Sequence, residues 1–197
     1  MVERLVAGRH HLSRAEVAAH QKQRLFKALA TVMAANGYIN TTVDDVIKEA
    51  KVSRATFYEH FDSKQDLFMS GYGRAQRLII AAIREVPVTG TPMERFGVML
   101  DRYLGFIALD PIRARLYLLE VYAAGPEAMR RRVELQQEFV AGVAQIFDAR
   151  EDADLFSCQA LVAAVSTLVT NALTRGDDVT ALRGPILAHT ARVMDRG

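Results

Sequence analysis

The sequence predicts an all-α protein, with a small three-helix unit at its N-terminal end and a larger helical body after it. Apolar residues recur at helical spacing, as Leu25, Leu29 and Val32 illustrate. Cap signals separate the periodic stretches, and many combine Ser, Thr or Asp with a following Pro or acidic residue. The alternation of β-branched and polar residues that indicates strands is scarce. We therefore expect about nine helices, three in the small unit and six in the body.

The N-terminal unit is predicted to consist of three helices behind a flexible basic arm formed by residues 1–14. The first helix should span residues 14–36 and stop at Gly37, because glycine readily adopts the left-handed conformation found at helix ends. A capping box predicts a short second helix within residues 42–50. Ser, Thr and Asp are favoured at helix starts, so the serine at the head of residues 53–61 predicts the third helix.

The body is predicted to begin with a long helix over residues 63–85, in which Gly71 and Gly73 could permit bending. Proline after a cap residue marks further helix starts. Residues 15–62 and 63–197 are thus expected to form two domains. The remaining helices are predicted over residues 92–109, 111–122, 126–149, 154–175 and 179–195, and the dipeptide Gly184-Pro185 could break the last one.

Composition favours a cytoplasmic protein without a membrane span. The 197 residues carry a formal net charge of only +2, so any nucleic-acid surface must come from local clustering. A single cysteine, Cys158, excludes an internal disulfide. No apolar run approaches the roughly 20 residues that a spanning helix needs. Phosphate-binding loops, nucleophile elbows and metal-ligand spacings are missing, so we expect no catalytic residues, no metal and no cofactor.

Residues 42–61 have the pattern of a helix-turn-helix, which needs two short helices locked by apolar residues and an outward face on the second helix. Phe57 and Phe61 are four residues apart and can share the inward face. Arg54 could donate two hydrogen bonds to guanine, the commonest specific contact in the major groove. The outward positions are Ser53, Arg54, Ala55, Thr56, Tyr58 and His60.

The run from Thr42 to Leu67, TVDDVIKEAKVSRATFYEHFDSKQDL, resembles the DNA-binding signature of the TetR/AcrR family of bacterial repressors. Lys51 departs from the family pattern, since many members have glycine in this turn. The resemblance implies phosphate contacts from Thr42, Tyr58 and Lys64. It implies that the groove is read by Ser53, Arg54, Thr56 and His60, with Ala55 packed close to the DNA. Two alternatives remain: Tyr58 and His60 could merely cover surface, and Arg54 could be solvated or contact a phosphate.

The resemblance also implies that the body binds a ligand and forms a dimer. Residues 155–175 are apolar on nearly all sides, so their helix should be buried on more than one side. Packing of the last two helices against those of a second copy would bury it; a central helix of a monomeric core is the alternative.

Candidate ligand-binding residues are aromatic or isolated polar side chains on apolar faces: Met99, Tyr103, Phe106, Tyr117, Glu120, Phe139 and Asn171. Glu120 stands out because a carboxylate inside an apolar run is costly unless it is paired. It could meet a cationic or hydroxylated ligand. It could equally pair with Arg113 or Arg115, or accept a hydrogen bond from a neighbouring helix.

These observations predict a sequence-specific, DNA-binding transcriptional regulator, in the family's usual form a repressor that a small-molecule ligand releases from a palindromic operator. Ligand binding would favour a homodimer whose reading heads are wrongly spaced. The alternative is an all-helical ligand-binding or scaffolding protein whose N-terminal helices only pack.

Overall fold

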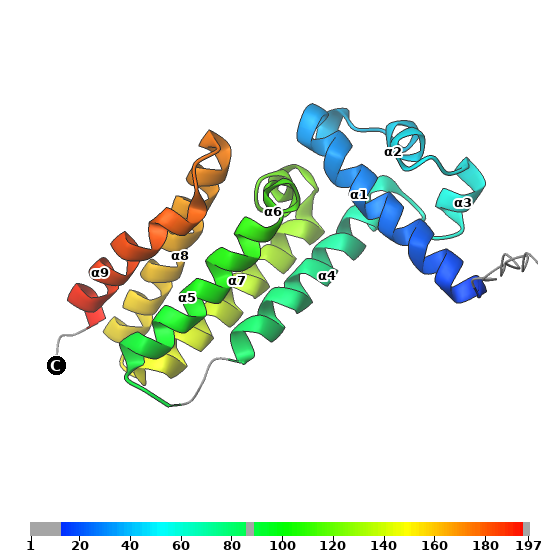
Figure 1. Ribbon diagram of the computed structural model, residues 1–197. Helices are drawn as coiled ribbons and strands as arrows, with labels where there is room; N and C mark the ends of the chain where they lie inside the picture. Colours follow the sequence, from blue (N-terminus) through cyan, green and yellow to red (C-terminus); the bar gives the residue numbers. More distant parts are fainter. Residues whose placement is uncertain (1–12, 86–88, 195–197) are drawn as a thin grey trace, which may run out of the picture.

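The computed structural model describes residues 13–85 and 89–194, so the predicted arm at residues 1–14 lies outside the described residues except for its last two. Within these ranges the protein is all-helical, with nine α-helices and no strand (Figure 1). The helices are α1 (Arg14–Asn40), α2 (Val43–Ala50), α3 (Arg54–Tyr58), α4 (Lys64–Arg84), α5 (Pro92–Leu109), α6 (Pro111–Leu118), α7 (Pro126–Phe147), α8 (Asp152–Arg175) and α9 (Arg183–Met194), with 3-10 turns η1 (Glu120–Ala123) and η2 (Val179–Leu182).

Helix α1 is longer than predicted, because Gly37 kinks it without ending it. Gly37 has a φ of 73°, and the helix resumes for one more turn to Asn40. The backbone N–H of Tyr38, freed by the kink, donates to the carboxylate of Glu120 at 2.6 Å. A partner 82 positions away in the sequence therefore supports this kink, and no local signal reveals it.

Three other predicted boundaries also need correction. Helix α3 ends at Tyr58, although a hydrogen bond from Phe61 N–H to the carbonyl of Phe57 (2.9 Å) closes one further turn. The helix predicted over residues 111–122 divides into α6 and η1. Gly184 lies in the first turn of α9 and breaks no helix, since η2 already ends before it.

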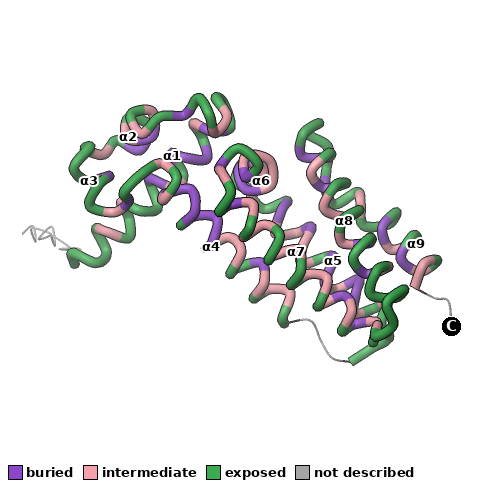
Figure 2. Tube along the Cα trace, turned by 180° about the vertical axis from the view of Figure 1, so that it is seen from behind, coloured by how far each residue is buried: buried purple, intermediate pink, exposed green. Residues whose placement is uncertain are grey.

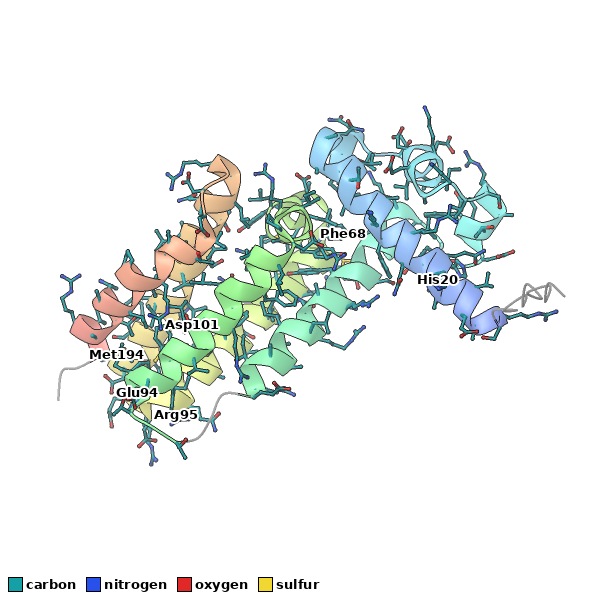
Figure 3. The ribbon with its side chains drawn as sticks, in the orientation of Figure 1. His20, Phe68, Glu94, Arg95, Asp101 and Met194 are labelled. Atoms are coloured by element: carbon teal, nitrogen blue, oxygen red, sulfur yellow. The ribbon has the colours of Figure 1, made fainter. Side chains whose placement is uncertain are left out.

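Two hydrophobic clusters organise the described residues. The first joins α1 to α4 with α6, η1 and the first turn of α7, and the second joins α5, α6, α7, α8, η2 and α9. Phe68 of α4 belongs to the first cluster and packs against Tyr38 of α1 and Tyr117 of α6 at centroid distances of 5.3 and 5.6 Å (Figure 3). Packing therefore continues from the N-terminal helices into the body across the predicted domain boundary between residues 62 and 63.

Helix α8 is the one described helix long and apolar enough to cross a membrane by length and composition. Cys158, Leu161 and Val169 on one of its sides belong to the second cluster, so α8 is a core helix. Its other sides are mostly exposed or half-buried in the single chain (Figure 2).

Candidate nucleic-acid interface and ligand cavity

Helices α2 and α3 form a helix-turn-helix that is anchored to the first hydrophobic cluster by aromatic side chains. Thr42 caps α2 through a reciprocal capping box with Asp45, and the hydroxyl of Ser53 caps α3 by accepting from Thr56 N–H. Phe57 is fully buried, whereas its neighbour Tyr58 is 48% exposed. The short α3 thus buries one face and presents the other to solvent.

The turn between α2 and α3 depends on a left-handed residue and on α1. Lys51, where the family pattern has glycine, adopts a φ of 51° and a ψ of 47°. The guanidinium of Arg24 on α1 donates to the carbonyls of Ala50 and Lys51, the latter at 2.7 Å. These bonds satisfy acceptors at the end of α2 that the helix itself leaves unpaired. The departure at Lys51 therefore leaves the geometry of the turn intact.

The outward face of α3 is accessible, but one of its predicted readers is already paired. Arg54 forms an ion pair with Asp44 of α2, and both side chains are more than half exposed. An exposed ion pair of this kind is weak, so exchange of Asp44 for a nucleic-acid acceptor costs little. Ser53 and Thr56 share a hydrogen bond of 2.9 Å between their hydroxyls, and Ala55 is exposed beside them.

His60 and Lys64 are bound more tightly within the protein than the sequence suggests. The Nε2 atom of His60 lies 2.8 Å from the side-chain oxygen of Gln21 on α1. The ammonium of Lys64 donates to the carbonyls of Tyr38 and Thr41 at 2.6 and 2.7 Å, and burial lowers its pKa. Lys64 thus closes the end of α1 and has one N–H left for an outside acceptor.

A cavity of about 510 Å³ lies in the body and reaches the N-terminal helices. Residues of α4, α5, α6, α7 and α8 line it, and Phe26 and Lys27 of α1 complete its wall. Five of the predicted ligand-binding residues line it: Met99, Tyr103, Phe106, Tyr117 and Phe139. Its size lies within the range of ordinary small-molecule sites, roughly 300–1,000 Å³.

The other two predicted ligand-binding residues lie elsewhere. Asn171 is exposed on α8, outside the cavity wall. Glu120 is also outside that wall, and its carboxylate accepts the backbone N–H of Tyr38. This corresponds to the third interpretation of Glu120 offered by the sequence, a hydrogen bond to a neighbouring helix. This hydrogen bond, and not an ion pair with Arg113 or Arg115, explains how the carboxylate of Glu120 is accommodated within an apolar run.

Gly71 and Gly73 permit close packing of α4, which runs as one helix through both residues. A Cβ at Gly71 would lie 2.1 Å from the hydroxyl of Tyr117 and 3.2 Å from the ring of Phe26. A Cβ at Gly73 would lie 3.0 Å from the guanidinium of Arg131 on α7. The structure therefore explains both glycines without the bending that the sequence suggested.

Sequence reasoning missed Arg132, which lines the cavity from α7. Its guanidinium donates to the hydroxyl of Ser166 on α8 at 3.3 Å and lies 4.9 Å from the ring centre of Tyr122. It is one of three consecutive arginines, and helical periodicity alone places no particular one of them on an inner face. Phe139 could have singled out Arg132, because it lies two helical turns beyond Arg132 and therefore on the same face of α7.

Helices α1 to α3, with the exposed face of α3 carried on a supporting helical body, have the architecture of a helix-turn-helix DNA-binding unit. Residues 25–70 match the family model described as bacterial regulatory proteins, tetR family. The N-terminal segment of the chain therefore matches the DNA-binding segment of this family of bacterial regulators.

Two curated regulators are similar to the chain over part of its length. The chain is 22% identical over 139 residues to the HTH-type transcriptional regulator TcmR of Streptomyces glaucescens, a match that covers 68% of the chain and 62% of TcmR. It is 25% identical over 126 residues to the fatty acid metabolism regulator protein of Bacillus subtilis, covering 64% and 63%. The chain thus spans a little under two thirds of the length of these two curated relatives.

Most of the fold is shared with solved structures of low sequence identity. A tetR-family regulatory protein from Rhodococcus RHA1 superposes with a TM-score of 0.74 at 18% identity, covering 88% of this chain and 96% of the other. The transcriptional regulator FadR from Bacillus subtilis, solved in complex with stearoyl-CoA, gives a TM-score of 0.71 at 20% identity, covering 84% and 95%.

Proposed function

We propose that the protein is a homodimeric, cytoplasmic repressor that binds a palindromic operator and releases it when a small molecule enters the cavity of the body. The observation that carries the proposal is the exposed face of α3 on a helix-turn-helix, within the segment that matches the family. In this proposal Thr42, Tyr58 and Lys64 contact phosphates. The residues that read or approach the groove are Ser53, Arg54, Ala55, Thr56 and His60.

Dimerisation is supported by the outward side of α8. Phe156 points away from the buried side of this apolar helix and is 70% exposed in the single chain, and Leu155 and Leu168, at the two edges of the buried side, are 38% and 41% exposed. Burial of apolar surface stabilises by about 25 cal/mol per Å², so a second copy that covers these side chains with its α8 and α9 would stabilise the dimer. A palindromic operator requires two reading heads about 34–36 Å apart, which a twofold dimer supplies.

Ligand control is supported by the cavity itself, since its wall includes residues of α1 as well as of the body. A ligand there contacts both parts of the chain. By linkage, ligand and operator should each lower the affinity of the other by the same factor. The complex of the Bacillus subtilis FadR with stearoyl-CoA gives one relative of this fold a ligand with a long apolar chain.

A gel-shift assay with fragments of the source genome tests the proposal. We expect specific complexes that weaken steeply as salt rises, because phosphate contacts release counterions. Tyr58→Phe removes a hydroxyl and keeps the edge contact of its ring with Phe57 (5.3 Å), so it should weaken binding about tenfold in the dimer without unfolding α3.

Tyr122→Phe is the matched control, because it removes the hydroxyl of a similarly exposed tyrosine in the body. Its DNA affinity should equal that of the wild type. Failure to shift any fragment at low salt would overturn the proposal and leave an all-helical ligand-binding protein.

A further inference from the structure

The cavity is polar at one end and apolar at the other. Helices α4 and α7 run away from the N-terminal helices, whereas α5 runs back toward them (Figure 1). Ring contacts between Tyr103 and Phe139 (5.5 Å) and between Phe96 and Phe147 (5.8 Å) mark the middle and the far end of the α5–α7 pair. Cavity residues at the far end are Phe96, Met99, Leu100 and Val143, all apolar.

The near end holds the guanidinium of Arg132. The ion pairs of the described residues include those of Arg113 with Asp110 and of Arg131 with Glu127, but none that involves Arg132. Its described polar partner is one neutral hydroxyl, that of Ser166. One neutral hydroxyl leaves most of the five N–H donors of this half-buried guanidinium available to a ligand.

Two phenols of the cavity wall lie within electrostatic reach of Arg132, and Tyr103 extends this polar region to the middle of the cavity. Tyr72 of α4 and Tyr103 of α5 both line the cavity, and the charge of Arg132 acts on both. Burial raises the pKa of Tyr103 to about 12 and also raises that of Tyr72, so both hydroxyls keep their protons at neutral pH. They can donate hydrogen bonds to an acceptor that Arg132 holds. The carboxylate in the cavity wall, that of Asp110, is already paired with Arg113 at 3.2 Å.

We propose that the cavity selects an amphipathic anion, with a carboxylate or phosphate head held by Arg132 between Tyr72 and Tyr103 and a hydrocarbon tail directed toward Phe96. A guanidinium in a partly desolvated site binds an oxyanion with two parallel hydrogen bonds, which a neutral head cannot reproduce. The tail orientation places the head next to α1 and α6, where the body meets the DNA-binding helices. The inference rests on the proposed ligand function of this cavity.

Isothermal titration calorimetry on the full chain tests the head group with three probes that share one tail: dodecanoate, dodecyl phosphate and dodecan-1-ol, each below its micellar or solubility limit. At least one anion should bind about ten- to a hundredfold more tightly than the alcohol. The stronger of the two anions identifies the head as carboxylate or phosphate. Equal affinities for all three probes would overturn the proposal.

Substitutions test the assigned residue. Arg132→Gln should lose the preference for the anion and keep the affinity for the alcohol, whereas Arg132→Lys should keep part of the preference. Arg130→Gln is the matched control, because Arg130 belongs to the same helix and lies outside the cavity wall, and it should behave as the wild type. An unchanged preference for the anion in folded Arg132→Gln overturns the assignment. If Arg132→Gln does not fold, an unchanged preference in Arg132→Lys overturns it instead.

A tail test gives an independent readout. Met99→Phe adds volume at the far end, so the chain length of the best-bound saturated carboxylate in a series from octanoate to hexadecanoate should shorten. A best length that does not change would refute the orientation. If an anion binds as described but leaves operator affinity unchanged, the head-group assignment stands and the proposed release mechanism fails; the two failures are therefore distinguishable.

Discussion

The contact between Gly71 and Tyr117 joins the cavity to the DNA-binding helices, and Gly71→Ala tests it. Tyr117 cannot swing away freely, because its ring packs against Phe68 and Tyr72 at 5.6 and 5.7 Å. The added methyl would lie 2.1 Å from the Tyr117 hydroxyl, a separation that neither atom can tolerate. Either α4 moves away from α6 or Tyr117 moves into the cavity.

Two opposing free energies set the expected magnitude. Overpacking a buried site costs about 1–3 kcal/mol. Alanine in a helix interior is more favourable than glycine by about 0.5–1 kcal/mol. We therefore expect Gly71→Ala to lower the free energy of unfolding by about 1–2 kcal/mol. In a Tyr117→Phe background the nearest atoms lie 3.2 Å away, so small shifts suffice and the substitution should be neutral or slightly stabilising.

Urea denaturation of the four proteins at one protein concentration measures this double-mutant cycle, with a coupling of about 1–2 kcal/mol expected. Gly105→Ala is the control, because an added Cβ there meets nothing within 4 Å, and it should stabilise by about 0.5–1 kcal/mol. Equal effects of Gly71→Ala in the wild-type and Tyr117→Phe backgrounds would refute the reasoning, since the clash would then not involve the hydroxyl.

Three further predictions concern stability. Lys51→Gly should raise the urea midpoint by the equivalent of about 0.5–1 kcal/mol, because a non-glycine residue is strained at a φ of 51°; a lower midpoint would contradict this. Glu120→Ala should lower the thermal midpoint more than Glu120→Gln, because only alanine leaves the Tyr38 N–H without its acceptor, at a cost of about 1–3 kcal/mol. Hydrogen bonds from the backbone and hydroxyl of Thr91 lower the pKa of Glu94 below its ordinary 4.5, so its contribution is complete above that pH and is lost as pH falls through the lowered pKa. Glu94→Gln should therefore lose less stability than the wild type between pH 7 and pH 4, as urea midpoints would report, and parallel losses would contradict the assignment.

Helix positions were largely predictable because their signals are local. Reciprocal capping boxes at Thr42 and Thr91, each with an acid three residues on, begin α2 and α5 where the sequence predicts. The end of α1 was not predictable, because glycine in a left-handed conformation ends a helix or kinks it depending on what receives the next N–H. That acceptor, Glu120, belongs to a segment 82 residues away.

The sequence predicted which residues line the candidate site, but not which partners its polar residues bond. The aromatic positions Tyr103, Phe106 and Phe139 were recognisable because apolar spacing reports which face of a helix turns inward. A polar residue on such a face has several possible partners, and only the tertiary packing selects one. Glu120 accepts a hydrogen bond from a backbone N–H of α1, and Arg132 donates one to a neutral hydroxyl in the cavity.

Phe26 is the residue through which a ligand could act most directly on the reading helix. It lies on α1, lines the cavity and makes an edge contact of 5.6 Å with Phe61, whose N–H is bonded to the carbonyl of Phe57 at the end of α3. Phe26→Leu keeps an apolar side chain but removes the aromatic edge contact. We expect operator affinity without ligand to change less than about threefold, because no predicted DNA contact is lost, while the ligand's effect on operator affinity falls by about five- to tenfold.

Fluorescence anisotropy of a labelled operator, titrated with and without the anion that binds most tightly, measures both quantities. Val17→Leu, at an exposed position of the same helix, serves as the control. A full ligand effect in folded Phe26→Leu would show that the coupling passes through α4 and bypasses α1, since α4 is the other element that reaches from the cavity to the helix-turn-helix.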